Sequence, residues 1–186
     1  MRYVVLAAGE SQRMGFDKVV ARIGTLAPLE RISLALGRRD STVVVPARLQ
    51  QVARTMMPRS RVVLNDEPGR GMAHSLRLAL RDVPPDEPFA VLLGDMPAMS
   101  QSTLARTERL LEPHVDVAFP TDRSGTPGHP VLFSARARAI VEALPAGDSL
   151  RAARYHPSLV RATWICSDAS AFLDLDVPAD WYAFGA

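Results

Sequence analysis

The run Phe89-Ala90-Val91-Leu92-Leu93 is apolar at every position and passes directly into Gly94-Asp95-Met96-Pro97. Val43-Val44-Val45 is a second apolar run, rich in β-branched side chains. Parallel strands that are covered by helices on both faces have this continuous apolar character, whereas a strand with one wet face alternates apolar and polar residues. Both runs therefore predict strands of a parallel sheet that lies between two layers of helices.

The remaining sequence alternates short apolar runs with amphipathic stretches. Strands are predicted at residues 3–8, 42–46, 61–65, 89–93, 116–120, 130–133 and 160–165, and helices at residues 28–38, 47–56, 72–82, 102–112, 135–144, 148–155 and 179–182. This alternation predicts right-handed βαβ units and an α/β fold, a Rossmann-like three-layer α/β/α sandwich with a mostly parallel sheet. Because no repeat or linker interrupts the pattern, we expect one domain over residues 1–186.

Composition narrows the class of protein. The 186 residues are 47% hydrophobic and 23% charged, a balance typical of globular domains rather than of disordered or fibrous chains. The net charge of +2 gives no reason to expect nucleic acid as a partner, and apolar runs of roughly five to seven residues fall short of the roughly 20 that span a bilayer, so we expect no membrane partner. One cysteine, Cys166, excludes an internal disulfide, and the start Met1-Arg2-Tyr3 lacks a signal-peptide pattern; we expect a cytoplasmic protein.

Ligands of open α/β sheets bind beyond the carboxyl ends of the strands, which draws attention to the loop after the first predicted strand. It reads Gly9-Glu10-Ser11-Gln12-Arg13-Met14-Gly15-Phe16-Asp17-Lys18. Two glycines, a hydroxyl and two cations suit backbone N–H groups that wrap around an oligophosphate. Lys18 is the only lysine among 22 basic residues, and lysine and arginine are not interchangeable at a tight site. The alternative is a glycine turn with solvated charges.

Carboxylates follow two other segments. Asp95 comes directly after an apolar strand, where it is suited to hold a hard cation such as Mg²⁺, although turn and cap aspartates are also common at strand ends. In Asp174-Leu175-Asp176-Val177-Pro178-Ala179-Asp180, alternation puts Asp174 and Asp176 on one side of an extended segment. Asp180 falls in the first turn of the terminal helix, where the helix dipole favours it.

The first loop carries a family resemblance. Leu6-Ala7-Ala8-Gly9-x-Ser11-x-Arg13-Met14-Gly15-x-x-Lys18 resembles the signature of the molybdenum cofactor nucleotidyltransferases, the molybdopterin cytidylyl- and guanylyltransferases, which have the nucleotide-diphospho-sugar-transferase-like fold. The resemblance implies that Arg13 and Lys18 are catalytic and that the nucleotide is bound by Leu6, Ala7, Ala8, Gly9, Ser11 and Gly15. It also implies that Asp95 and Asp176 hold Mg²⁺, because the Gly-Asp-x-Pro and Asp-x-Asp-x-Pro-x-Asp segments match the family.

Two further segments resemble family elements. Gly71-Met72-x-x-Ser75-Leu76 implies that Gly71 and Ser75 lie against the nucleobase, and Gly125-x-Pro127-Gly128-His129-Pro130-Val131-Leu132-Phe133 implies that Gly128 and His129 lie on the acceptor side, where His129 donates a hydrogen bond to an acceptor phosphate. A plain helix entry and a Gly- and Pro-rich hairpin remain the structural alternatives. Relatives that use CTP tend to have Leu-Ala-Ala-Gly in the first loop, as this chain does.

The implied reaction is attack of an acceptor phosphate on the α-phosphorus of CTP, with release of pyrophosphate. The implied acceptor is molybdopterin or the molybdenum cofactor, and a molybdoenzyme or its chaperone is the implied partner. The segment Ile23-Gly24-Thr25-Leu26-Ala27-Pro28-Leu29 is longer than in relatives, which weakens the acceptor assignment. Two alternatives stay open: a guanylyltransferase or other enzyme of this fold with another phosphorylated acceptor (phospholactate or a sugar phosphate), and a non-catalytic nucleotide- or cofactor-binding chaperone.

Overall fold

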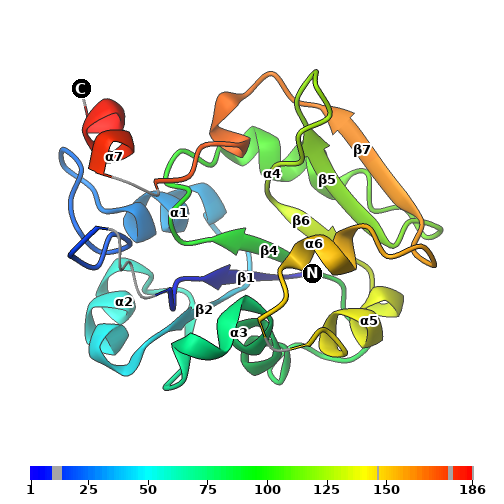
Figure 1. Cartoon of the computed structure of the whole chain (residues 1–186), viewed down its shortest axis with the longest axis horizontal. Helices are drawn as coiled ribbons and strands as arrows, with labels where there is room; N and C mark the ends of the chain where they lie inside the picture. The colour runs from blue at the N-terminus through cyan, green and yellow to red at the C-terminus, as the bar shows by residue number, and fades with distance from the viewer. Residues whose placement is uncertain (10–13, 146, 176–177, 186) are drawn as a thin grey trace.

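The computed structural model describes residues 1–9, 14–145, 147–175 and 178–185. Within this part of the chain, seven strands form one sheet in the order β3-β2-β1-β4-β6-β5-β7 (Figure 1). The strands are β1 (Arg2–Leu6), β2 (Ser41–Val45), β3 (Arg61–Leu64), β4 (Phe89–Leu93), β5 (Val117–Thr121), β6 (Val131–Phe133) and β7 (Arg161–Ile165). All neighbouring strands are parallel except that β6 is antiparallel to β4 and β5.

Helices alternate with the strands as predicted. They are α1 (Pro28–Leu36), α2 (Gln50–Met56), α3 (Gly71–Leu80), α4 (Gln101–Glu108), α5 (Arg138–Glu142), α6 (Leu150–Arg154) and α7 (Pro178–Gly185), with short 3₁₀ turns before α2, α3 and α5 and after β7. The predicted α/β sandwich with a mostly parallel sheet is confirmed. No helix in the described residues is long and apolar enough to cross a membrane.

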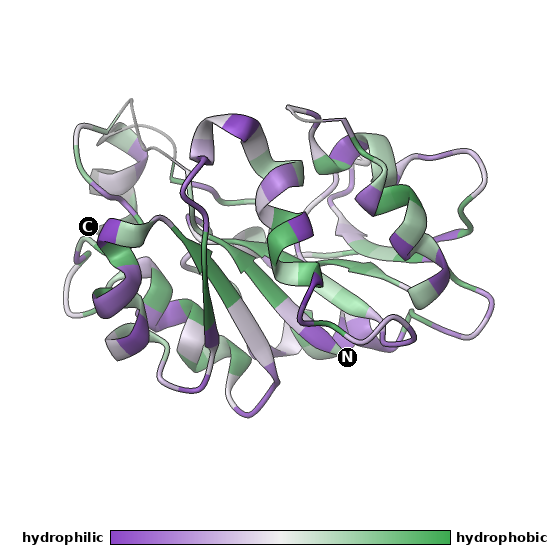
Figure 2. Cartoon of the chain, turned by 90° about the horizontal axis from the view of Figure 1, so that it is seen from below, coloured by the Kyte–Doolittle hydropathy of each residue, from purple (hydrophilic) through white to green (hydrophobic). Residues whose placement is uncertain are grey.

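The two faces of the sheet build two separate hydrophobic cores. In β1, Val4 and Leu6 pack with α3, α5 and α6, whereas Tyr3 and Val5 pack with α1, α2 and α4. This division follows from the strand geometry, because successive side chains point to opposite faces. Burying each large apolar side chain stabilises the fold by about 1.5–3 kcal/mol. Figure 2 shows the resulting layers, with apolar strands between helices whose outer sides are polar.

The reversed direction of β6 decides which residues reach the binding edge of the sheet. Val131, at the start of β6, lies opposite Val91 of β4. Because the strands are antiparallel, the segment that precedes β6, and not the one that follows it, lies beside the carboxyl end of β4. The Nδ1 atom of His129 is accordingly 3.3 Å from the carbonyl oxygen of Val91. The reversal therefore carries His129 toward the edge that also bears Asp95.

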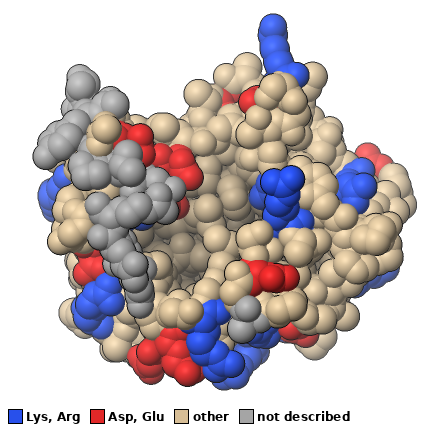
Figure 3. Space-filling view, in the orientation of Figure 1, with Lys and Arg blue, Asp and Glu red and all other residues tan. Residues whose placement is uncertain are grey.

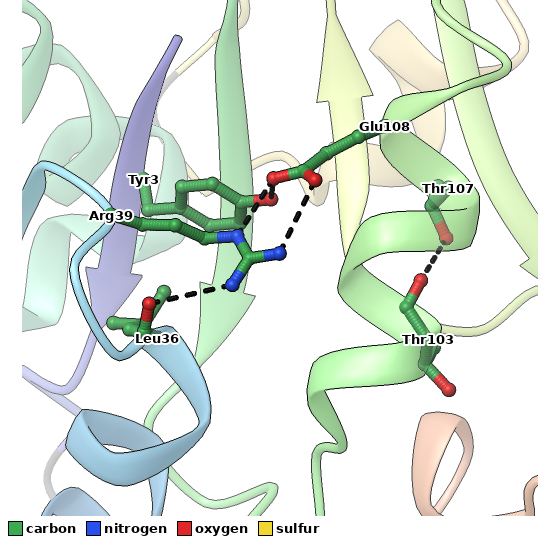
Figure 4. Close-up of polar contacts among 6 residues, drawn as sticks. All are labelled: Tyr3, Leu36, Arg39, Thr103, Thr107 and Glu108. Carbon is green, nitrogen blue, oxygen red and sulfur yellow. Dashed lines mark hydrogen bonds and ion pairs between the residues drawn. The ribbon is translucent and has the colours of Figure 1, made fainter.

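The opposite edge of the sheet is closed by a polar cluster of Tyr3, Arg39 and Glu108 (Figure 4). The Tyr3 hydroxyl donates to Glu108 Oε1, and Arg39 Nε donates to the same oxygen over 2.8 Å. Burial, followed by the hydrogen bond to Glu108, raises the pKa of Tyr3 above its usual value, so the phenol stays neutral. This cluster joins β1, the segment after α1 and α4 at the end remote from the binding edge.

Candidate active site

A cavity of about 260 Å³ opens at the carboxyl ends of β1 and β4. The face of the molecule drawn in Figure 3 is hollowed on the side where these strand ends lie in Figure 1. The residues that line the cavity come from four segments and are Leu6, Ala7, Ala8, Gly9, Lys18, Val19, Pro68, Gly71, Met72, Ser75, Leu93 and Asp95. Eight residues that the sequence singled out, in four separate segments, thus meet around one cavity.

Close approach of the strands behind this cavity requires Gly94. Its N–H donates to the Leu6 carbonyl oxygen over 2.8 Å. A Cβ atom at position 94 would lie 2.7 Å from the Cβ of Ala7 and 3.0 Å from its Cα. Real Cβ atoms do not come this close to other carbon atoms, so an added methyl group would force the first loop and the end of β4 apart. Gly94 therefore sets the position of Asp95 relative to the first loop.

Lys18 and Asp95 form an ion pair at the wall of the cavity. The Nζ atom of Lys18 is 2.8 Å from Asp95 Oδ2, and it also donates to the carbonyl oxygen of Leu175 over 2.9 Å. The two side chains are 12% and 20% exposed, so water screens the pair only partly. The N–H of Leu175 donates to the backbone carbonyl oxygen of Asp95 over 3.1 Å. Leu175, which follows Asp174, is thus held beside Asp95.

The second carboxylate oxygen of Asp95, Oδ1, is buried. No donor among the residues that the structure describes reaches Asp95 Oδ1. A buried carboxylate oxygen that lacks a partner is costly and calls for an explanation. Carboxylate oxygens are the ligands that Mg²⁺ and similar hard cations prefer. The unpartnered oxygen therefore fits one ligand position of a divalent cation, while Lys18 holds the other oxygen.

The wall of the cavity that contains Ser75 is held by a residue that was not predicted from the sequence. Asn65 follows β3, is fully buried, and donates from Nδ2 to Ser75 Oγ over 2.8 Å. Its Oδ1 accepts from the N–H of Glu67 over 2.9 Å. Gly71 has a φ angle of +82°, which glycine adopts far more readily than other residues, and a Cβ atom at this position would lie 3.1 Å from the Cα of Gly147. A polar residue directly after an apolar strand was the sequence signal for Asn65.

A second cavity of about 220 Å³ adjoins the first, because Met72 lines both. Its other lining residues are Pro127, His129, Ser149, Leu150, Arg151 and Arg154. Burial, followed by the nearby Arg154 charge, lowers the pKa of His129 to about 4. The ring is therefore neutral at physiological pH. Since a carbonyl oxygen only accepts hydrogen bonds, the contact with Val91 favours the tautomer with the proton on Nδ1 and leaves Nε2 as an acceptor. In this tautomer the ring has no N–H left to donate to an acceptor phosphate, so the structure does not support the hydrogen bond expected from the sequence.

The remaining sequence-predicted residues have other positions. Gly128 lines neither cavity; it is buried where a Cβ would lie 2.5 Å from the carbonyl oxygen of Ala171, so it lets the chain pass beneath that turn. Gly15 has a φ angle of +72° and also lies outside both linings. Ser11, Arg13 and Asp176 lie outside the described residues, so their predicted roles stay predictions.

Arg154 is the most notable residue that the sequence did not single out. It sits on α6 and is 6% exposed, with its guanidinium carbon 5.0 Å from the centre of the Phe119 ring. The sequence signal was its spacing from Leu150, since residues four apart share a helix face and Leu150 is buried. Because arginines on short amphipathic helices are usually exposed to solvent, the sequence did not predict a functional role for Arg154.

The geometry of this site indicates a class of protein. An α/β sheet with a glycine-containing loop after β1 and a Gly-Asp turn after β4, both at one cavity, is a nucleotide-binding arrangement. The model of the MobA-like NTP transferase domain family matches residues 3–161, and the chain belongs to this family. The resemblance inferred from the first loop is thereby confirmed.

Curated relatives match part of the chain. The bifunctional protein GlmU of Chromobacterium violaceum is 34% identical over 111 residues, which are 57% of this chain and 24% of that protein. This chain spans about a quarter of the length of the curated relatives it matches.

Solved structures match nearly the whole chain. The homologue of Mycobacterium tuberculosis Rv0371c from Mycobacterium sp. strain JC1 is 26% identical with a TM-score of 0.85, covering 99% of this chain and 94% of that one. Rv0371c of M. tuberculosis H37Rv in complex with manganese is 22% identical, with a TM-score of 0.76 and coverage of 98% and 96%. Molybdopterin-guanine dinucleotide biosynthesis protein A of Archaeoglobus fulgidus is 16% identical, with a TM-score of 0.71 and coverage of 98% and 96%; the last two show the shared fold.

Proposed function

We propose that residues 1–186 act as a nucleotidyltransferase domain that moves CMP from CTP to a phosphorylated acceptor, with molybdopterin or the molybdenum cofactor as the preferred acceptor. The observation that carries the proposal is the Lys18–Asp95 pair at the wall of the cavity formed by residues 6–9. A cation and a carboxylate from different loops meet there, and Asp95 Oδ1 is left without a protein donor among the described residues. A binding-only protein has no need for such a carboxylate.

In the proposed reaction, an oxygen of the acceptor phosphate forms a bond to the α-phosphorus of CTP. The bond from the α-phosphorus to the oxygen that bridges it to the β-phosphorus breaks, and pyrophosphate leaves. A phosphate monoester is already anionic at neutral pH, so the nucleophile needs no general base. The chain's contribution is positioning and charge: loop N–H groups hold the triphosphate, and Lys18 and Arg13 stabilise negative charge that grows in the transition state.

Asp95 and Asp176 are the proposed ligands of a divalent cation. When bound, Mg²⁺ would neutralise charge on the triphosphate and orient it for in-line displacement. The buried Asp95 Oδ1 supports a cation ligand at that residue, and the manganese complex of the mycobacterial neighbour supports a divalent ion in this fold. Magnesium itself is part of the proposal, because NTPs are usually handled as magnesium complexes.

CTP is the proposed donor because of the residues at the end of β1. Ala7 and Ala8 are buried and line the cavity with small side chains. The Leu-Ala-Ala-Gly sequence is also the form that resembles the CTP-using relatives. Ser75, which Asn65 holds in place, offers a hydroxyl group on the base side.

The acceptor is proposed from the family and from the second cavity. The Archaeoglobus neighbour is a molybdopterin-guanine dinucleotide biosynthesis protein, which supports a molybdopterin acceptor, and a molybdoenzyme or its chaperone would receive the product. The long segment 23–29 closes into a turn with a bridge between Ile23 and Leu26, and none of its residues lines either cavity. A cytoplasmic location belongs to the proposal and is supported by the single cysteine.

The test is a screen of CTP, GTP, ATP and UTP against molybdopterin, phospholactate and sugar phosphates, with pyrophosphate release as the readout. The Asp95→Asn variant is the matched control for chemistry at this site. We expect pyrophosphate release with CTP and molybdopterin, and much less release with the variant. Turnover with another acceptor instead would reject molybdopterin as the acceptor and leave the proposed nucleotidyl transfer standing. Binding of nucleotide without pyrophosphate release from any pair would favour the binding protein.

A further inference from the structure

The second cavity contains cationic groups without facing carboxylates. Arg154 and Arg151 line it together with the neutral His129, and the other lining residues are uncharged. None of the ion pairs found among the described residues involves Arg154, and its Nε is buried without a hydrogen-bond partner. The wall of this cavity is therefore positively charged and has an unsatisfied donor.

Burial of an arginine in this state is unusual. Arg138, whose side chain is 13% exposed, donates to Glu142 and to the carbonyl oxygens of Leu80, Val83 and Pro84. Arg154 is more buried and instead packs its guanidinium against the ring of Phe119. Burial lowers the pKa of Arg154, an effect that the charge interaction and side-chain hydrogen bond with Tyr155 oppose and the nearby Arg151 strengthens. A buried cation usually has an anionic partner, and none of the described residues supplies one for Arg154.

We propose that the second cavity binds an oxyanion of the acceptor, a phosphate or carboxylate group, and that Arg154 is the residue that binds it. The inference rests on the proposed function, because it concerns the acceptor side of the same site. Arg154 Nε and the guanidinium nitrogen atoms donate to the anion, and Arg151 adds a second positive charge. Arginine is suited to this task, since its planar donors match the two oxygens of such groups.

The position of the cavity favours the acceptor over the donor. Residues 7–9 after β1, where we propose that the triphosphate binds, and Lys18 line the first cavity and not the second. Met72 lines both cavities, and Gly71 at the start of α3 lies close to Gly147, two residues before Ser149 of the second cavity. A ligand in the second cavity is thus a neighbour of the nucleotide and not part of it. Because His129 is neutral in this cavity, Arg154 is the residue that selects for an anionic ligand.

The test uses the full chain with side-chain NMR signals as local reporters. The Nε–H signal of Arg154, assigned by its loss in Arg154→Met, and the ring signals of His129 are followed while inorganic phosphate or malonate is added. Arg154→Met keeps the length of the side chain and its packing on Phe119, whereas Arg154→Lys restores the charge. Arg59→Met, at an exposed site before β3, is the charge-matched control. CTP binding in the first cavity reports that each variant is folded.

We expect saturable shifts of both signals in the wild type, unchanged in Arg59→Met. In Arg154→Met, phosphate should bind about 10–100-fold more weakly, as measured from the His129 ring signals. Arg154→Lys should bind phosphate with an affinity between those of the wild type and Arg154→Met. A response to phosphate alone identifies a phosphate group as the ligand, and a response to malonate as well identifies a carboxylate as acceptable. Absence of both shifts, or equal binding by Arg154→Met, would overturn the inference.

The enzymatic readout separates this inference from the proposed function. In the transfer assay, Arg154→Met should raise the KM for the acceptor and leave the KM for CTP unchanged. Anion shifts without any nucleotidyl transfer would contradict the proposed function and leave the anion site standing. Transfer with a wild-type acceptor KM in Arg154→Met would contradict the anion site and leave the transferase standing.

Discussion

The ammonium of Lys18 lies 2.8 Å from Oδ2 of Asp95, although the two residues follow different strands. Lys18 belongs to the loop after β1 and Asp95 to the turn after β4, and these strands are neighbours in the sheet. The carboxylate thus has one oxygen held by the only lysine of the chain and one oxygen that no donor in the described residues reaches. The pair places a fixed cation beside a candidate ligand of a divalent ion.

The exchange Lys18→Arg should lower pyrophosphate release about tenfold or more, because a broad guanidinium cannot take the place of a compact ammonium. Lys18 Nζ is confined between Asp95 Oδ2 and the Leu175 carbonyl oxygen, and its side chain is 12% exposed. Initial rates with saturating CTP measure the effect, and thermal denaturation checks the fold. Arg59→Lys is the conservative control at an exposed site. Activity within about twofold of wild type would mean that Lys18 has no special role.

Asp95→Asn and Asp176→Asn should each remove most turnover and keep the fold. If the two carboxylates share one cation, the double variant should be little worse than either single one, because residues that act as a unit fail together. The rates are measured over a series of Mg²⁺ and Mn²⁺ concentrations. Asp122→Asn, in the exposed turn after β5, serves as a control. Wild-type rate and metal dependence in Asp176→Asn would exclude that residue from the site.

The sequence predicted the layers and the binding edge because local pattern determines both. Every predicted strand and helix is found, and Asp95, Lys18, Gly71 and Ser75 meet at one cavity since parallel strands end at the same edge. Boundaries follow local pattern less closely: the first strand ends at Leu6 rather than Ala8, although the Ala7 N–H still donates to Val44.

Features that depend on contacts between residues far apart in the chain were not predicted from the sequence. The direction of β6 is set by its partners β4 and β5, and no local pattern distinguishes an antiparallel strand in this position. The burial of Arg154 depends on contact with Phe119, which is far away in the sequence. The Lys18–Asp95 pair likewise joins residues whose distance from one another only the fold determines.

Gly94→Ala should destabilise the protein and weaken nucleotide binding together. The new methyl group would meet Ala7 Cβ at 2.7 Å, and overpacking of this kind costs about 1–3 kcal/mol. Denaturant unfolding measures the stability, and titration with CTP measures the binding. Gly69→Ala is the matched control, because a Cβ there meets no atom within 4 Å and the backbone φ is unstrained. Equal stability of the two variants would show that the strands tolerate a wider spacing.

CTP should exceed GTP in kcat/KM by about 10–200-fold, the range expected for a base pocket of the wrong size. The small side chains of Ala7 and Ala8 line the cavity at the end of β1, where we propose that the base binds. Steady-state pyrophosphate release with a fixed acceptor gives both values. Equal use of the two nucleotides, or a preference for GTP, would reject the cytidylyl assignment and leave nucleotidyl transfer intact.

His129 should make the folded state sensitive to acid. Its pKa is about 4 in the folded protein, because of burial and the nearby Arg154, and the ordinary value is 6.5. Between these two values the unfolded chain binds a proton that the folded protein does not. The free energy of unfolding should therefore fall as the pH is lowered from about 6.5 to 4, by up to about 1.4 kcal/mol per pH unit.

His129→Asn should flatten this pH dependence, whereas His114→Asn should not, because the His114 side chain is 73% exposed. Urea unfolding of the wild type and both variants at several pH values between 4 and 7 provides the slopes, which are compared instead of absolute stabilities. Identical slopes in the wild type and His129→Asn would show that His129 titrates normally in the folded protein.

The most direct test of the central claim follows isotope-labelled CTP through a single turnover with molybdopterin. Label at the α-phosphorus should appear in the acceptor, label at the γ-phosphorus should appear in pyrophosphate, and one pyrophosphate should form for each CMP transferred. Asp95→Asn should remove most of both products. Release of γ-labelled inorganic phosphate, or acceptor that carries no α-label while CTP is consumed, would contradict nucleotidyl transfer by this chain.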